Sequence, residues 1–191
     1  MFIPKGAKYV ISKLENAGFE AFLVGGCVRD SLMNRIPPDY DITTNATPDD
    51  MLCVFKDDKT LTHGLKHGTV TVVVDGECFE VTTYRIDGEY LDSRHPQSVE
   101  FSKKLKDDLS RRDFTMNAIA YSEKCGYVDE FCGVSDIKNK IIRTVGSPDK
   151  RFNEDALRIL RCIRFASVLG LEIEKNTSDS LIKNAHLLNN I

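Results

Sequence analysis

Asp39 and Asp41 are the residues of this 191-residue chain whose type and spacing most directly suggest chemistry. Residues 39–43 alternate as a β-strand does, so we expect both carboxylates on one face and Tyr40 and Ile42 on the other. At roughly 6–7 Å along the chain, two such charges repel each other unless a cation lies between them. Carboxylate oxygens suit Mg²⁺, which takes its other ligands from water and substrate phosphates. A solvated acid pair at a strand end is the alternative interpretation, because D-x-D is common.

A glycine pair upstream of these acids indicates a phosphate-binding turn. Gly25 and Gly26 follow an apolar run, residues 19–24, and open a short helix that carries Arg29. Glycine lets backbone N–H groups approach a phosphate closely, and a helix N-terminus favours an anion. Arg29, one turn further on, would add a charge-assisted contact. A simple tight turn, with Arg29 paired to an acid, is the alternative.

Glu80 is a third candidate carboxylate, on a predicted strand where Glu80, Thr82 and Tyr84 share one face. It would serve as a further metal ligand or accept the proton of an attacking hydroxyl. A cross-strand ion pair with a lysine or arginine explains it as well.

Residues 111–118 place two arginines, an acid and an amide just before an apolar stretch. Arg112 suits a triphosphate contact, and Asp113 and Asn117 suit hydrogen bonds to a ribose hydroxyl. The alternative is that Asp113 caps a short helix and the arginines are solvated.

A fourth group of polar residues begins at Glu154 and Asp155. Both lie within three or four residues of Arg158, so they are neighbours on a helix surface. A carboxylate that accepts beside a guanidinium that donates can imitate the pairing edge of a base. Arg161 and Arg164 follow Arg158 at intervals of three residues, and on this interpretation they extend toward the phosphates of the nucleotide. Surface salt bridges are the alternative.

The elements that must position these residues fall into two groups. Up to about residue 145, helical and alternating segments mix, and they include a hairpin of residues 69–74 and 78–84 around an Asp-Gly turn. Residues 86–98 are polar and predict a loop. From residue 149 the pattern is helical. We expect one amphipathic helix over 153–169 and another over 177–188, the first with an apolar side made of Ala156, Leu157, Leu160, Ile163 and Val168.

Composition excludes several classes of protein. The 41% hydrophobic and 29% charged content is that of a soluble globular chain, and no apolar run approaches the roughly 20 residues that span a membrane. The six cysteines form no C-x-x-C pair, and no signal peptide is recognisable, so we expect reduced thiols, no zinc and a cytoplasmic protein. The net charge is −3, divided into −6 over residues 1–100 and +3 over residues 101–191.

Five stretches together resemble the class II tRNA nucleotidyltransferases, which are the bacterial CCA-adding enzymes and their poly(A) polymerase relatives. They fall in the order and spacing of that family and cover most of residues 21–166: LVGGCVRDSLMNRIPPDYDITTNATPDDM, THGLKHGTVTVV, FEVTTYR, RRDFTMNAIAY and RFNEDALRILRCIRFA. The resemblance implies an α+β fold, with a polymerase-β-like head (mixed sheet with flanking helices) over residues 1–147. A helical neck would follow over residues 148–191, cut before the body and tail of such enzymes.

The same resemblance assigns roles to the candidate residues. Asp39 and Asp41 match the Mg²⁺ ligands, and Glu80 fits the strand pattern. The matched nucleotide-binding positions are Gly26, Arg29, Arg112, Asp155, Arg158, Arg161 and Arg164. Glu154, Asp155 and Arg158 would correspond to the protein template that selects CTP and then ATP.

The implied activity is template-independent addition of CCA to tRNA 3′ ends from CTP and ATP, with release of pyrophosphate. Residues 86–98 resemble the flexible element of CCA-adding members. Poly(A) polymerase, A-adding activity and a fragment that binds nucleotide but is inactive alone remain alternatives. Two other classes stay open: a regulatory nucleotide-binding module, and a nucleotidyltransferase that acts on a small molecule or a protein.

Overall fold

A seven-stranded mixed sheet is the centre of the structure, a computed structural model that describes residues 1–88, 90 and 97–190. The strand order is β3-β4-β5-β2-β1-β8-β9, and β2 and β5 pair in parallel while their neighbours pair antiparallel. The bounds are β1 Ala21–Val24, β2 Ile42–Thr44, β3 Lys59–Leu61, β4 Thr69–Val74, β5 Glu77–Thr83, β8 Ala120–Ser122 and β9 Gly126–Val128. This arrangement confirms the predicted α+β class.

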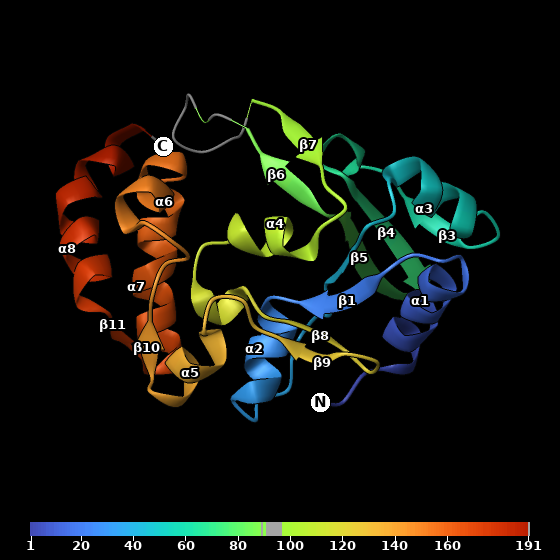
Figure 1. Cartoon of the computed structure of the whole chain (residues 1–191), viewed down its shortest axis with the longest axis horizontal. Coiled ribbons are helices and arrows are strands. Elements are labelled where there is room, and N and C mark those ends of the chain that lie inside the picture. Colours follow the sequence, from blue (N-terminus) through green and yellow to red (C-terminus); the bar gives the residue numbers. More distant parts are fainter. Residues whose placement is uncertain (89, 91–96, 191) are drawn as a thin grey trace.

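Helices flank the sheet, and three of them gather at one end of the molecule (Figure 1). The segment predicted to be the head carries α1 Lys5–Asn16, α2 Gly26–Leu32, α3 Pro48–Val54, α4 Leu105–Ser110 and α5 Gly133–Lys138. The segment predicted to be the neck carries α6 Pro148–Glu154, α7 Leu157–Leu169 and α8 Lys175–Asn184, followed by a 3₁₀ turn over Ala185–Asn190. Two small ladders complete the fold: β6 Arg85–Asp87 with β7 Val99–Phe101, and β10 Ile141–Ile142 with β11 Glu172–Ile173. No helix of the described residues is long and apolar enough to cross a membrane.

Local signals in the sequence produced the elements that they predicted. The β4–β5 hairpin turns at Asp75 and Gly76, both with positive φ (51° and 84°), as an Asp-Gly turn between strands requires. At the start of α3, the Thr47 side chain and Asp50 form a reciprocal capping box. Each signal depends on residues close in sequence, so tertiary contacts did not override it.

The predicted continuous helix over 153–169 is wrong, because the chain breaks between α6 and α7. Asp155 is extended, at φ −143° and ψ 104°, and its Oδ1 accepts a hydrogen bond from Leu157 N at 3.0 Å. An aspartate side chain that bonds to nearby backbone N–H groups competes with helix continuation and starts a new helix instead.

The predicted apolar side of this helix is wrong as well. Leu160, Ile163 and Val168 are 48%, 49% and 62% exposed. The face turned to the core carries Ile159, Cys162 and Phe165. Apolar residues occupy both sides of α7, so periodicity alone did not identify the buried side.

The loop predicted over residues 86–98 begins too early. Residues 86 and 87 belong to β6, where Ile86 pairs with Glu100 and Asp87 with Val99. Residues 89 and 91–96 of that loop lie outside the described residues.

Candidate active site

The acid pair lies immediately before β2 rather than within a strand, which corrects the predicted strand over 39–43. Asp41 is half-buried, and its carbonyl oxygen accepts a hydrogen bond from Val24 N at 3.1 Å, whereas Asp39 is exposed. The parallel register sets Ile42 opposite Val81, so that the preceding residues, Asp41 and Glu80, are next to each other. Asp39 and Glu80 are also close enough to act electrostatically on Asp41, so the three predicted carboxylates lie near one another at the start of β2.

Burial and the neighbouring charged side chains shift the pKa of Asp41. Burial, followed by the neighbouring carboxylates of Asp39 and Glu80, raises the pKa of Asp41 to about 6, against the opposing effect of Arg112. Burial and the two carboxylates disfavour the ionised form of Asp41, and a bound cation would stabilise that form.

The donor set fits a hard divalent cation that completes its shell with other ligands. Asp39 and Asp41 supply carboxylate oxygens, the ligands that Mg²⁺ prefers. Within the described residues, no group of three or more His, Cys, Asp or Glu side chains is close enough to hold a metal ion. The protein thus offers two carboxylates, and water and substrate oxygens would supply the rest, as is usual for Mg²⁺.

The glycine turn faces two arginines. Gly25 has φ 77° and ψ −128°, and a Cβ atom there would lie 3.1 Å from Nη1 of Arg112. A Cβ atom on Gly26 would lie 3.7 Å from Nη2 of Arg29. Arg112 Nε is buried and has no hydrogen-bond partner in the described part of the chain. Because the two glycines have no side chains, the space between the backbone of the turn and the two guanidinium groups stays open, and a phosphate would fit there.

Arg29 is the first member of a buried hydrogen-bonded chain that reaches the neck. It donates from Nε to Asp30 (2.9 Å) and from Nη1 to Asn117 Oδ1 (2.8 Å). Asn117 donates to Asp113 Oδ1 at 3.0 Å, and Arg161 donates to Asp113 Oδ2 at 2.6 and 2.9 Å. Four of the predicted site residues, from α2 to α7, are therefore joined directly.

Asp113 is buried at the centre of this chain. Burial alone would raise its pKa, but Arg161 and the hydrogen bond from Asn117 hold the pKa of Asp113 below its ordinary value. Its Oδ1 also accepts from Phe114 N at 2.8 Å. Both carboxylate oxygens thus have protein partners.

Asp108 is a residue of this site that the sequence analysis missed. Its carboxylate is fully buried and accepts hydrogen bonds from Arg111 (2.7 and 3.0 Å) and from Arg112 Nη2 (2.9 Å). Thr43 Oγ1 donates to it at 3.3 Å, two residues beyond Asp41. Burial opposes ionisation, but the two arginines keep the pKa of Asp108 below its ordinary value. Asp108 precedes Arg112, the predicted phosphate-binding arginine, by four residues, and this helical spacing is the signal that would have identified it.

The neck residues meet the head at Arg111. Glu154 Oε2 accepts from Arg151 Nη1 (2.8 Å) and from Arg158 Nη1 (2.7 Å). Arg158 also donates from Nη1 to the carbonyl of Arg151 (3.1 Å) and from Nη2 to the carbonyl of Arg111 (3.2 Å). Arg158 has five N–H groups, and within the described residues these bonds use three of them, which leaves its Nε–H and one Nη2–H.

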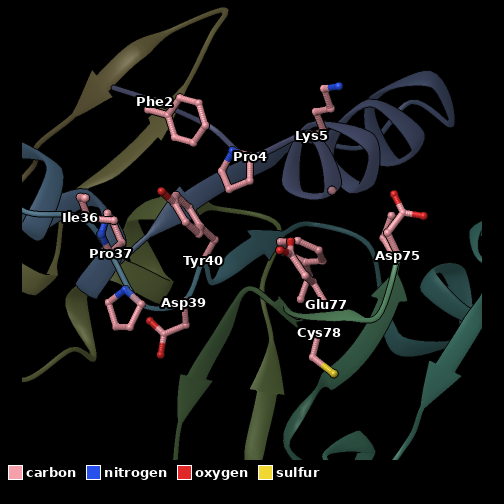
Figure 2. A pocket seen from close by; sticks show the side chains of 14 residues that line it. Phe2, Pro4, Lys5, Ile36, Pro37, Asp39, Tyr40, Asp75, Glu77 and Cys78 are labelled. Atoms are coloured by element: carbon pink, nitrogen blue, oxygen red, sulfur yellow. The ribbon is translucent and has the colours of Figure 1, made fainter.

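Two cavities lie on either side of the segment that leads to the acid pair, and their charges differ. The larger is a groove of about 730 Å³ between that segment, the N-terminus and the β4–β5 turn. Asp39, Glu77 and Asp75 follow one another across it (Figure 2), and among the described residues Lys5 is the only basic one that lines it. An excess of carboxylates disfavours a phosphate there.

The smaller cavity, about 400 Å³, lies between α2 and α7. Among the described residues, Arg29, Arg35 and Arg164 line it against one acid, Asp30. Its charge suits a polyanion better than the charge of the groove does.

A mixed sheet with flanking helices, a glycine turn before two carboxylates and an arginine-rich neck together define a nucleotidyltransferase head. The chain belongs to the family described as Poly A polymerase head domain, whose profile matches residues 21–143.

Relatives and solved structures agree with this family. The chain is 49% identical over 185 residues to a CCA-adding enzyme of Pediococcus pentosaceus, covering 97% of this chain and 46% of that protein. It is 51% identical over 176 residues to a CCA-adding enzyme of Staphylococcus saprophyticus, covering 92% and 44%. The crystal structure of the Bacillus stearothermophilus CCA-adding enzyme in complex with CTP superposes with a TM-score of 0.87 at 45% identity, covering 96% of this chain and 44% of that one. The chain therefore spans less than half the length of the relatives it matches.

Proposed function

We propose that this chain forms the catalytic part of an enzyme that adds CCA to tRNA 3′ ends, using CTP and then ATP and releasing pyrophosphate. The observation that carries the proposal is the acid pair Asp39 and Asp41 beside a glycine turn that faces Arg29 and Arg112. The names of the similar proteins, CCA-adding enzymes, support the choice of product. tRNA, CTP and ATP as substrates belong to the proposal, and a tRNA substrate and the free cysteines fit the cytoplasm.

Asp39 and Asp41 are the proposed ligands of Mg²⁺. When bound, the ion would lower the pKa of the attacking 3′-hydroxyl and neutralise charge on the departing pyrophosphate. Glu80, next to Asp41, is the proposed acceptor of the proton of that hydroxyl.

The triphosphate is proposed to lie against Gly26, Arg29, Arg112, Arg161 and Arg164. Asp113 and Asn117 would not contact the triphosphate directly, because their oxygens already accept hydrogen bonds from Arg161 and Arg29. Both residues thereby contribute to nucleotide binding by orienting cationic groups.

Base selection is assigned to Glu154, Asp155 and Arg158. Glu154 holds one end of the Arg158 guanidinium, and its Nε–H and second Nη2–H, which make no hydrogen bond within the described residues, would contact the base. We expect Asp155→Ala or Arg158→Ala to blur the choice among CTP, ATP, GTP and UTP more than it weakens triphosphate binding. Competition between labelled nucleotides measures this, and an equal loss for every nucleotide would indicate simple phosphate binding instead.

The activity is tested by incorporation of labelled CTP and ATP into tRNA that lacks CCA, with the new 3′ ends sequenced. The chain is assayed alone and fused to the C-terminal part of the Pediococcus relative that it does not cover. We expect Asp39→Ala to reduce incorporation at least about 10³-fold, because it removes a proposed metal ligand. Asp49→Ala, an exposed acid on α3, is the control and should retain activity. Unchanged incorporation by Asp39→Ala would contradict the mechanism.

A poly(A) polymerase is the second candidate, and the description of the matching family favours it. The same sequencing decides between the two, because a poly(A) polymerase would extend the tRNA with A alone.

A further inference from the structure

One aromatic ring lies beneath three of the proposed nucleotide-binding arginines. The guanidinium carbons of Arg29, Arg161 and Arg164 lie 5.0, 5.3 and 5.0 Å from the centroid of Phe165. Arg29 comes from α2 in the head, and the other two come from α7 in the neck. Each distance is within the roughly 6 Å over which a cation is attracted to the face of a ring.

The ring itself is held by the core. Phe165 is 7% exposed, and it packs edge-on against Phe114, with centroids 6.0 Å apart and an interplanar angle of 88°. Phe114 is fully buried. Because a packed ring cannot turn to follow its partners, it gives the three guanidinium groups a fixed surface, in addition to the hydrogen bonds that hold Arg29 and Arg161.

The three cations are only partly neutralised by protein acids. Arg29 pairs with Asp30 and Arg161 pairs with Asp113, whereas Arg164 has no ion pair in the described part of the chain. Phe165 also lines the 400 Å³ cavity between α2 and α7. Arg29 and Arg164 line that cavity too, and Arg161 lies over the same ring. Three cations gathered in this way, one of them without an ion pair in the described part of the chain, favour a ligand with several negative charges.

We infer that Phe165 is a positioning residue for triphosphate binding: its ring holds the guanidinium groups of Arg29, Arg161 and Arg164 where they bind the phosphates of the nucleotide. This inference rests on the proposed function. The ring contacts no phosphate itself, and it acts through the three arginines. Its contribution is independent of the base, because it acts on the arginines that bind the phosphates.

The test compares Phe165→Leu with Phe165→Tyr in the 191-residue chain. Dissociation constants are measured by calorimetry for CTP, for ATP and for inorganic tripolyphosphate, each with Mg²⁺. Leucine keeps an apolar side chain but removes the ring, so we expect binding of all three ligands to weaken by about tenfold. Tyrosine keeps the ring and should bind within about twofold of wild type. Phe165→Met replaces the leucine variant if that variant fails to fold.

Phe55→Leu is the matched control. Phe55 is also a buried ring with a cation over it, Lys13 Nζ at 5.9 Å, and Lys13 is not a proposed site residue. It should lower the melting temperature without changing the three dissociation constants.

Three results would overturn the inference: unchanged binding by Phe165→Leu, equal weakening by leucine and tyrosine, or weakening for CTP and ATP but not for tripolyphosphate. Asp39→Ala separates this inference from the proposed function. If incorporation depends on Asp39 while Phe165→Leu binds normally, only the role of Phe165 is wrong. A wild-type chain that binds none of the three ligands would contradict both.

Discussion

At the residue scale, Gly25 shows why a side chain would be incompatible with the site. Its positive φ is readily adopted by glycine alone, and the space that a Cβ atom would occupy lies against Arg112. The two constraints are separate: the first acts on the backbone, and the second acts on the guanidinium group that faces the turn.

We therefore expect Gly25→Ala to lower the free energy of unfolding by about 1–3 kcal/mol and also to weaken CTP binding. Gly18→Ala is the control, because Gly18 has φ 88° but no atom within 4 Å of the added Cβ. It should cost stability alone. Urea unfolding and calorimetry measure the two effects, and normal CTP binding by Gly25→Ala would contradict the proposed phosphate-binding turn.

At the scale of elements, the buried carboxylate of Asp113 links α2 with α7, because it holds Arg161 of α7 directly and Arg29 of α2 through Asn117. Asp108 in α4 holds Arg111 and Arg112, which follow it in the chain. A buried charge without its partner is costly, so each pair constrains the position of an arginine more firmly than a surface pair would.

This arrangement predicts a pH dependence of stability. The folded pKa of Asp113 lies below its ordinary value of 3.8, so the stabilisation that it provides is fully present above about pH 4 and is lost as the pH falls further. We expect Asp113→Asn to be less stable than wild type at pH 7, with a difference that shrinks between pH 4 and pH 2. Urea unfolding across this range measures it. A difference that stays constant down to pH 2 would show that the charge of Asp113 contributes nothing.

At the scale of the whole molecule, the head and the neck share one hydrophobic core. Cys162, Phe165 and Leu171 of the neck belong to the same buried cluster as Val28 and Ile119 of the head. The parallel ladder of β10 with β11 adds backbone hydrogen bonds across the predicted boundary at residues 147 and 148. That boundary remains a prediction, and the shared core indicates that the two parts do not unfold independently.

We accordingly expect the whole chain to unfold in a single thermal transition. A fragment of residues 1–147 loses the three neck side chains from the core, which at about 1.5–3 kcal/mol each amounts to about 5 kcal/mol or more. Its melting temperature should fall well below that of the whole chain. Calorimetry measures both, and two separate transitions, or a fragment as stable as the whole chain, would contradict a shared core.

The sequence by itself determined the features that depend on neighbours along the chain. The Asp-Gly hairpin, the capping box at Thr47 and the order of glycine turn, acid pair and arginine-bearing helix were all predicted, because turn and cap preferences act within a few residues. The α+β class followed from the same local patterns and from the family resemblance.

Only the tertiary structure decided which of these residues meet. It placed Asp41 beside Glu80 through the parallel register of β2 and β5, and it showed Asp108 behind Arg112. It also turned Phe165, rather than Leu160 or Ile163, toward the core and the arginines. The physical reason is that α7 carries apolar residues on both sides and starts anew after the break at Asp155. Its buried face therefore depends on packing against residues far away in the sequence, such as Val28.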